Sequence, residues 1–347
     1  MHAVIKEVIS NREIMHFADK NLKISSFANK IFVETEESKF KIETPENSFI
    51  KRLLSINRLS RRALRLDKCN VFTIANSLII IRSGRVWCYY GQDKIIKETL
   101  KLENCRNILH QSMAISSDNR IYFGEYGSNR QQKEMPIYMS KNQGKDWSKI
   151  FIFPPGKIKH IHGCHWDPYE ERIWVFTGDS EGECWILVAD REFKNIEWLG
   201  NGSQVYRACN AFFEKDHVHW LMDSPIENSY HIRFDRKDRK IQKMTQFPGP
   251  VWYIKRLMDG YYLAATACEI GPSVTTRYAH LFCSNDLKEW IEVLRLKKDN
   301  LPKKLFKFGV IGFADGEQSS KHFYIFTEGL EGFDGKVAIC NIVDQAT

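Results

Sequence analysis

Short apolar runs separated by polar turn residues recur along the chain. Between residues 106 and 155 the runs lie at 113–116, 120–125, 136–140 and 149–153. They are rich in Ile, Tyr and Phe and bounded by Gly, Asn, Asp and Ser, which is typical of β-strands joined by tight turns. The same order returns from residue 162 to residue 198. The pattern therefore predicts a repeated unit of four strands.

Further units extend this pattern in both directions. Two follow near 204–248 and 249–297, and one precedes them through 71–74 and 78–81. The C-terminal segment offers only three strands, whereas the first 50 residues offer several short ones. A ring closed by N-terminal strands would leave few exposed strand edges. We therefore predict an all-β fold, a single β-propeller domain over residues 1–347, with seven blades and six as the alternative.

Three tryptophans close polar turns between predicted third and fourth strands. The turns span 140–147, 190–198 and 284–290, and they end at Trp147, Trp198 and Trp290. These tryptophans are separated by one or two periods of about 45–50 residues, the length of a propeller blade. We expect the three indole rings to occupy equivalent positions beside the fourth strand of their units.

Composition, charge and cysteine content indicate the cellular compartment and whether the chain spans a membrane. The chain has 347 residues, 43% of them hydrophobic, a formal net charge of +8 and nine cysteines. The cysteines lack CxxC spacing and lie mostly in apolar runs, as in reduced cytoplasmic proteins. No apolar run is long enough to span a bilayer, and the N-terminus lacks the apolar core of a signal peptide. These features predict a cytoplasmic protein with no membrane span.

Basic residues are scattered except in the segment 50–66, which holds Arg58, Arg61, Arg62 and Arg65. Its spacing favours a helix or a long loop, with the basic residues in solvent or facing a glycan. This distribution does not favour nucleic acid as a partner.

The turn 140–147 resembles an Asp-box, the BNR repeat of sialidase-like β-propellers. Ser140, Gly144 and Trp147 keep the positions of that motif. Asn142 stands where the motif has aspartate, and Asp146 stands where it has threonine. In that family the motif is a turn that stabilises the fold.

Residues 160–169 and 174–179 resemble uncharacterised bacterial sialidase-like proteins that accompany surface-polysaccharide genes, and the resemblance covers most of residues 100–345. It implies the propeller fold. True sialidases combine an arginine triad, a Tyr/Glu pair and an aspartate with an Arg-Ile-Pro motif. This chain has no Arg-Ile-Pro sequence, so the resemblance does not imply hydrolysis of sialic acid.

Candidate catalytic carboxylates end the predicted second strands. In a propeller the connections that follow second strands share one rim with those that precede first strands, whereas the Asp-box turns lie on the other. The acidic residues at these strand ends are Glu125, Asp179, Asp223, Glu269 and Glu328. Paired carboxylates suit glycosidic cleavage, because one protonates the leaving oxygen while the other attacks or activates water.

The same predicted rim collects imidazole, guanidinium and aromatic groups. His160 and His162 precede one first strand, Arg207 precedes the next, and Tyr126 and Trp252 lie on the same rim. Arginine can bind a sugar carboxylate through two hydrogen bonds, and histidine serves as a general base near neutral pH. Two imidazoles at positions 160 and 162 could also bind zinc or manganese, but we expect no obligatory cofactor. His165 is expected to pack between blades, as are His217 and His219.

These residues favour an enzyme that hydrolyses an acidic sugar linkage in a bacterial surface polysaccharide or its precursor. The predicted catalytic residues are Glu125, Asp179, Asp223 and His162, and the predicted substrate-binding residues are Tyr126, His160, Arg207, Trp252, Glu269 and Glu328. A polysaccharide lyase using His, Tyr and Arg is the first alternative. A non-catalytic scaffold that binds an acidic oligosaccharide or polysaccharide is the second. Walker, nucleophile-elbow and dinucleotide-binding motifs are absent from the sequence.

Overall fold

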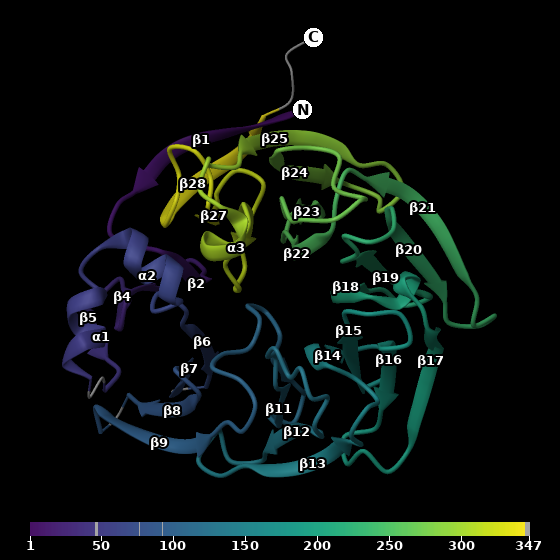
Figure 1. Ribbon diagram of the computed structural model, residues 1–347, viewed down its shortest axis with the longest axis horizontal. Coiled ribbons are helices and arrows are strands. Elements are labelled where there is room, and N and C mark those ends of the chain that lie inside the picture. Colours follow the sequence, from purple (N-terminus) through teal and green to yellow (C-terminus); the bar gives the residue numbers. More distant parts are fainter. Residues whose placement is uncertain (46–47, 76, 92, 344–347) are drawn as a thin grey trace. The chain divides into compact units, whose positions relative to one another are not determined.

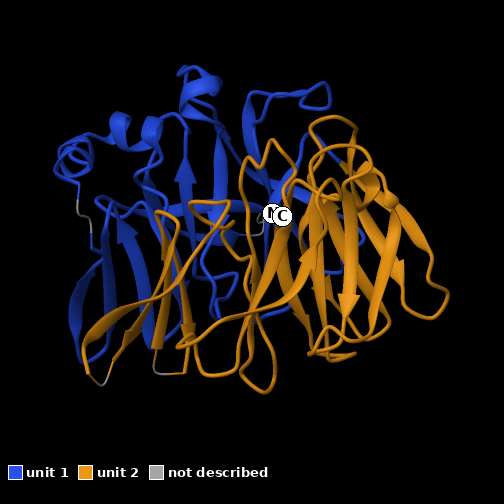
Figure 2. Ribbon diagram, turned by 60° about the horizontal axis from the view of Figure 1, so that its bottom comes forward, with its two compact units in different colours: residues 1–69, 247–347 blue, residues 70–246 orange. Residues whose placement is uncertain are grey.

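The computed structural model describes residues 1–45, 48–75, 77–91 and 93–343. These residues form seven four-stranded antiparallel sheets, which are the blades of an all-β, seven-bladed β-propeller fold (Figure 1). The predicted fold class is therefore confirmed. Two compact units divide the sheets: unit 1 comprises Met1–Cys69 and Phe247–Thr347, and unit 2 comprises Asn70–Gln246 (Figure 2). The single domain remains a prediction.

Unit 2 contains four sheets, each a meander of four consecutive strands. The strands of the first two are β6 (Asn70–Ile74), β7 (Ser77–Arg82), β8 (Arg85–Tyr90), β9 (Ile95–Lys101), β10 (Ala114–Ile115), β11 (Ile121–Gly124), β12 (Met135–Ser140) and β13 (Ser148–Phe153). Those of the other two are β14 (His160–Asp167), β15 (Arg172–Gly178), β16 (Cys184–Ala189), β17 (Ile196–Gly202), β18 (Ala208–Phe213), β19 (His217–Met222), β20 (Ser229–Asp235) and β21 (Ile241–Phe247).

Unit 1 contains the remaining three sheets. Two are meanders, with strands β2 (Ile14–Ala18), β3 (Leu22–Phe27), β4 (Lys30–Thr35), β5 (Lys39–Glu43), β22 (Val251–Arg256), β23 (Tyr262–Thr266), β24 (Tyr278–Ser284) and β25 (Ile291–Lys297). The third combines the two ends of the chain, with β26 (Val310–Phe313), β27 (Phe323–Glu328), β28 (Lys336–Val343) and β1 (His2–Ile9). Its strand order is β1-β28-β27-β26, so the N-terminal strand is the fourth strand of the C-terminal sheet.

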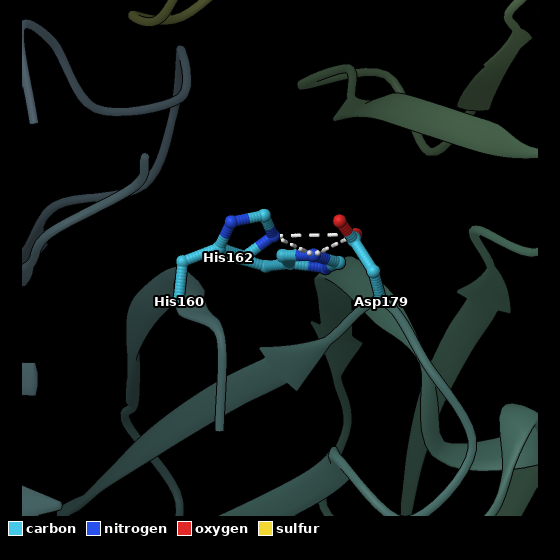
Figure 3. Close-up of side chains that lie close together, drawn as sticks. All are labelled: His160, His162 and Asp179. Atoms are coloured by element: carbon cyan, nitrogen blue, oxygen red, sulfur yellow. Dashed lines mark hydrogen bonds and ion pairs between the residues drawn. The ribbon is translucent and has the colours of Figure 1, made fainter. Parts of the chain in front are cut away.

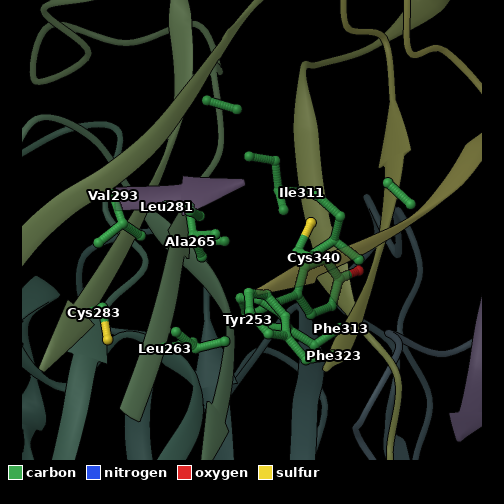
Figure 4. Close-up of a cluster of buried hydrophobic side chains, with 14 of the residues drawn as sticks. Tyr253, Leu263, Ala265, Leu281, Cys283, Val293, Ile311, Phe313, Phe323 and Cys340 are labelled. Atoms are coloured by element: carbon green, nitrogen blue, oxygen red, sulfur yellow. The ribbon is translucent and has the colours of Figure 1, made fainter. Parts of the chain in front are cut away.

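Buried side chains from facing strands hold neighbouring sheets together within each unit. In unit 1, Tyr253 and Leu263 from one sheet share a cluster with Phe313, Phe323 and Cys340 from the next (Figure 4). In unit 2 an equivalent cluster joins the sheets β14–β17 and β18–β21 through Trp174, Trp220 and their neighbours. Apolar residues alternate with polar ones along the strands, and this alternation gives each sheet an apolar face that packs against its neighbour.

The helices formed by the described residues are few and short. They are α1 (Phe49–Leu54), α2 (Arg58–Leu64), α3 (Lys303–Phe306) and the 3₁₀ turn η1 (Gln204–Tyr206). None of the described helices is long and apolar enough to cross a membrane. All nine cysteines are free, and eight of them are buried.

The arginines of α2 are not solvated, contrary to the sequence-based expectation. Arg61 and Arg62 are 3% and 0% exposed, and they pair with Glu13 and Asp299 respectively. Arg58 contacts Glu13, Asp67 and Asp334 at 2.7–2.9 Å. Carboxylates that are distant in sequence thus neutralise these arginines, because buried charges need partners. The apolar residues Phe49 and Ile56 instead face solvent, at 78% and 75% exposure.

The predicted polar turns lie between third and fourth strands. In the turn after β12, the side-chain oxygen of Asn142 accepts a hydrogen bond from the backbone N–H of Asp146 at 3.0 Å, and Ser140 Oγ accepts one from Gly144 N–H at 2.9 Å. Asp286 accepts two backbone hydrogen bonds in the turn after β24, at 2.8 and 3.1 Å. Short polar side chains therefore fix both turns.

The three tryptophans have equivalent contacts. In unit 2, Trp147 and Trp198 pack on the fourth strand of the preceding sheet: Trp147 Nε1 donates to Thr99 Oγ1 at 3.1 Å, and Trp198 packs edge-on against Phe153 at 5.8 Å between ring centroids. In unit 1, Trp290 packs edge-on against Phe247 at 5.7 Å. Trp147 and Trp290 directly precede their strands, whereas Trp198 lies within β17.

Replacement of Trp147 by alanine is expected to lower the free energy of unfolding by about 3 kcal/mol, because it removes a half-buried indole and its contact with Phe123. Urea unfolding followed by circular dichroism measures the loss. Trp198→Ala is the matched control and should cost less, since Trp198 is 38% exposed. Equal losses would contradict the packing role of Trp147.

Candidate functional site

A cluster of titratable side chains gathers in unit 2 at the ends of adjacent strands. His160 and His162 lie on β14, and Asp179 follows β15 directly (Figure 3). Arg207 precedes β18, and Asp223 follows β19. Asp179 and Asp223 thus follow second strands of unit 2 and Arg207 precedes a first strand, as predicted, whereas His160 and His162, predicted to precede their first strand, lie on it. We call His160, His162 and Asp179 the His/Asp cluster.

Three side-chain atoms of the His/Asp cluster lie within hydrogen-bond distance of one another. The Nε2 atoms of His160 and His162 are 3.1 Å apart. They lie 3.2 and 3.3 Å from the same carboxylate oxygen, Asp179 Oδ1. The histidine side chains are 3% and 1% exposed, whereas that of Asp179 is 24% exposed. The cluster therefore meets solvent mainly through the carboxylate.

A β-bulge in β14 positions the two imidazoles. The pairing of β14 with β15 shifts register between Ile161 and Gly163, so His162 is the extra residue. Bulges re-aim side chains and are common beside functional sites. Gly163 permits the close approach to β18, because a Cβ there would lie 3.0 Å from the carbonyl oxygen of Cys209 and 2.5 Å from His165 Nε2.

The Nδ1 atoms of both histidines face backbone carbonyl groups. His160 Nδ1 lies 2.7 Å from Gly127 O, and His162 Nδ1 lies 3.0 Å from Ala208 O. A carbonyl oxygen only accepts hydrogen bonds, so each Nδ1 carries the proton and donates it. In the neutral imidazole the other nitrogen then holds a lone pair. Both Nε2 lone pairs are therefore directed at Asp179 and at each other.

Cations and a second carboxylate surround the His/Asp cluster. Arg207 Nη2 lies 3.1 Å from Asp179 Oδ1, and Arg207 Nε lies 3.5 Å from Asp223 Oδ2. Lys159 Nζ lies 2.6 Å from Asp179 Oδ2. Asp223 Oδ2 also lies 3.6 Å from His162 Nδ1. Two positive and two negative side chains thus balance one another around the imidazoles.

Burial and neighbouring side chains shift two pKa values in the cluster. Burial lowers the pKa of His160, although Asp179 opposes the shift. Burial alone would raise the pKa of Asp179, but its pairing with the adjoining His160 and His162 outweighs burial and holds that pKa well below its usual range. At neutral pH the carboxylate is ionised and the His160 imidazole is neutral.

The contacts of the Glu125 carboxylate are with residues outside the His/Asp cluster. This carboxylate accepts hydrogen bonds from the backbone N–H groups of Glu103 and Asn104 at 2.8 and 2.5 Å, and from Tyr138 Oη at 2.9 Å. The Glu125 side chain is completely buried. Burial and the neighbouring Glu125 raise the pKa of Tyr138, so the phenol stays protonated and donates. These contacts give Glu125 a structural role, and we assign it no catalytic one.

The remaining sequence-predicted residues divide between the two units. Tyr126 joins the cluster in unit 2, with its ring centroid 4.2 Å from that of His160. Trp252 and Glu269 contact each other in unit 1, where Trp252 Nε1 donates to Glu269 Oε1 at 2.6 Å. Glu328, also in unit 1, pairs with Arg65 at 3.0 Å and with Lys68.

Two residues near the cluster were not predicted from the sequence. Lys159 directly precedes His160 in the sequence, so its position next to a predicted site residue could have indicated that it belongs to the site. Cys209 is one of the cysteines that lie in apolar runs, yet its thiol donates to Asp223 Oδ2 at 3.3 Å. The carbonyl groups of Gly127 and Ala208 carry no signal in the sequence, because every residue has one.

Three other histidines of unit 2, His165, His219 and His231, are buried within or between its sheets. His165 Nε2 donates to Cys209 O on the neighbouring sheet at 2.8 Å, which agrees with its predicted packing. His219 Nδ1 lies 2.8 Å from His231 Nε2. Burial lowers the pKa of His219 to about 3 and that of His231 to about 4.

Comparison with known proteins finds relatives in structure only. Neither a family model nor a curated protein matches the chain. A chain of the mitotic checkpoint complex has a TM-score of 0.56 and 6% identity, covering 99% of this chain and 91% of that one. The AfRom2 CNH domain has a TM-score of 0.55 and 8% identity, and the match covers 99% of this chain and 100% of that one. The extracellular domain of BT4673 from B. thetaiotaomicron has a TM-score of 0.55 and 13% identity, and the match covers 97% of this chain and 39% of that one. These comparisons show the fold alone.

The Glu125 carboxylate offers a direct test of its structural role. Glu125→Gln replaces one acceptor oxygen with an amide donor that faces a backbone N–H, and we expect a loss of about 1–3 kcal/mol in the free energy of unfolding. Urea unfolding measures it. Glu103→Gln makes the same change at an exposed ion pair with Lys149 and should have little effect. A Glu125→Gln protein with unchanged stability would contradict the structural role.

Acid should destabilise unit 2 through His219 and His231. Their folded-state pKa values lie below the ordinary 6.5, so the unfolded state binds more protons and stability falls as pH drops from 6.5 towards about 4. For His231 the loss is on the order of 3 kcal/mol at pH 4. His217, Arg233 and Glu214 are the charged or titratable neighbours.

Urea unfolding at a series of pH values measures this slope. His231→Gln keeps hydrogen-bonding capacity without titrating, so it should flatten the slope between pH 6.5 and pH 4. An unchanged slope in that variant would show that His231 is not the responsible group.

Proposed function

We propose that this chain is a glycan-active enzyme that cleaves an acidic polysaccharide or oligosaccharide by β-elimination at the His/Asp cluster. The observation that carries the proposal is the pair of Nε2 lone pairs of His160 and His162, held beside Asp179, Arg207 and Lys159. Elimination from a uronic acid requires a base, a means of neutralising the sugar carboxylate, and a proton donor for the leaving oxygen.

The imidazoles supply the base. Burial keeps His160 neutral near pH 7, and the carbonyl of Gly127 fixes its tautomer with the lone pair on Nε2. His162 has the same tautomer through Ala208. A base that is neutral and already oriented at the working pH loses little free energy to reorganisation.

The cations favour an anionic substrate. Lys159 is 32% exposed and lies at the solvent side of the cluster beside Asp179. A sugar carboxylate that approaches there meets Lys159 first, while Arg207, 7% exposed, positions Asp179 from below the surface. Tyr126, stacked against His160, can contact the sugar face or return a proton to the leaving oxygen.

The bonds balance without added water. An imidazole Nε2 takes the proton on the carbon next to the sugar carboxylate. The electrons of that C–H bond form a carbon–carbon double bond, and the glycosidic carbon–oxygen bond on the adjacent carbon breaks. The leaving oxygen then takes a proton, so the products are one unsaturated uronate and one free hydroxyl end.

Hydrolysis by paired carboxylates, our leading prediction from the sequence, has less support. It needs two carboxyl groups that flank the substrate. Glu125 is used by backbone N–H groups, and Asp223 Oδ2 is already in contact with Arg207, His162 and Cys209. Asp179 is then the accessible carboxylate among the described residues of the unit 2 cluster.

The setting follows from the sequence resemblance. We place the reaction on a bacterial surface polysaccharide or its precursor, in the cytoplasm. The likeness of residues 100–345 to proteins that accompany surface-polysaccharide genes supports the substrate. The nine free cysteines support a reducing compartment.

Turnover of uronate-containing oligosaccharides tests the proposal. The wild type should release a product that absorbs in the ultraviolet and whose summed fragment mass equals that of the substrate. His162→Ala should lower turnover by about 100-fold or more, because it removes a base. His217→Ala is the matched control, since His217 begins β19 at the end opposite Asp223.

Three results would overturn the elimination mechanism. Products that have gained water would restore hydrolysis, and equal turnover in the His162→Ala and wild-type proteins would remove the imidazole from the chemistry. Binding of acidic oligosaccharides with no product from any of them would make the chain a non-catalytic scaffold.

A further inference from the structure

The two Nε2 lone pairs and Asp179 Oδ1 form a triangle of acceptor atoms. Its sides are 3.1, 3.2 and 3.3 Å. Three acceptors at these distances repel one another unless a positive centre lies among them. A metal ion bound by all three atoms is such a centre.

The dimensions of the triangle fit a metal ion. Bonds of about 2.1 Å place neighbouring ligand atoms about 3.0 Å apart in octahedral geometry and about 3.4 Å apart in tetrahedral geometry. All three sides fall within that interval. Figure 3 shows the two imidazole edges and the carboxylate directed at a common point.

The contacts behind the ligand atoms also match a metal site. Histidines that bind metals donate their other ring N–H to a carbonyl or a carboxylate, which fixes the ring and increases its basicity. His160 donates to Gly127 O and His162 to Ala208 O. Asp223 Oδ2, at 3.6 Å from His162 Nδ1, adds a carboxylate behind the second imidazole.

A competing set of ligands is less consistent with these contacts. His162 Nδ1, Cys209 Sγ and Asp223 also lie close together. Binding through Nδ1 would require its lone pair to face the Ala208 carbonyl oxygen at 3.0 Å, which places two acceptors in contact. The hydrogen bond to Ala208 therefore selects the Nε2 side.

We propose that His160, His162 and Asp179 bind one divalent transition-metal ion, of the class of Zn²⁺ or Mn²⁺. Two imidazoles select such ions over Ca²⁺ and Mg²⁺, which prefer oxygen ligands. Three protein ligands leave at least one position for water or an anionic substrate group. The ion would use the Nε2 lone pairs that the proposed elimination uses as its base, so the metal-bound cluster and the metal-free cluster are alternative states of one site.

The charged side chains around the His/Asp cluster determine whether removal of Lys159 raises or lowers the affinity for the metal ion. Arg207 and Lys159 each bind Asp179, and they oppose a second positive charge, whereas Asp223 favours it. Removal of Lys159, whose Nζ lies 2.6 Å from Asp179 Oδ2, should free that oxygen. Lys159→Ala is therefore expected to bind metal several-fold more tightly than the wild type.

Calorimetric titration of chelator-treated full-length protein with zinc chloride, and separately with manganese chloride, tests the site. The wild type should take up one equivalent. His162→Ala and Asp179→Asn should each weaken binding by about 100-fold or more, and His217→Ala should not. His217 and His219 share the spacing of His160 and His162, so the control removes a histidine from an equivalent sequence pattern.

Circular dichroism and thermal unfolding of each variant show whether it is folded. The Co²⁺-loaded wild type provides a second readout, because its visible absorption reports nitrogen and oxygen ligands and should disappear in His162→Ala. Absence of one-equivalent binding in the folded wild type would overturn the site, as would equal affinity in the wild type and both ligand variants. Metal binding by a protein that cleaves no uronate in its chelator-treated, metal-free form would refute the proposed function and leave the site standing.

Discussion

Two backbone carbonyl groups determine the chemistry of the His/Asp cluster. Gly127 O and Ala208 O each accept a proton from an imidazole Nδ1, and this assigns the tautomer of both rings. The carbonyls are held by the backbone around two different sheets of unit 2, so their positions depend on the fold. Without these carbonyl groups, the proton of each imidazole could move from Nδ1 to Nε2. The Nε2 lone pairs would then no longer point toward Asp179.

Arg207 joins the two acidic residues of the site. It contacts Asp179 at 3.1 Å and Asp223 at 3.5 Å, and its Nη1 also donates to the backbone oxygen of Asp179 at 2.7 Å. The guanidinium group suits this task because its donors lie in a rigid plane. It holds one carboxylate at the surface and another behind His162. The proposed chemistry and the proposed metal site both rely on this arrangement.

Sequence patterns predicted the fold class and most of the site in unit 2. Alternation and polar turns located the strands, and strand order then placed His160, Asp179, Arg207 and Asp223 at neighbouring strand ends. The role of Glu125 was not predictable, because the N–H groups that bind it belong to residues 103 and 104, which no pattern connects to it.

The arginines of α2 were misjudged for the same reason. Their partners, such as Glu13 and Asp334, lie far away in sequence, and local spacing cannot reveal them. The bulge at His162 is likewise a product of pairing between strands. Periodicity describes one strand at a time, so contacts that depend on two segments remain hidden until the fold is known.

The pairing of β1 with β28 has a consequence for the order of assembly. His2 pairs with Val343, and Ile9 pairs with Val337. A ribosome releases the N-terminal strand first, yet its partner is synthesised more than three hundred residues later. During that interval the edge of β1 has no native neighbour in its sheet, and contacts between such distant segments form slowly. The pairing of β1 thus joins segments more than three hundred residues apart, and it can form only after β28 has been synthesised.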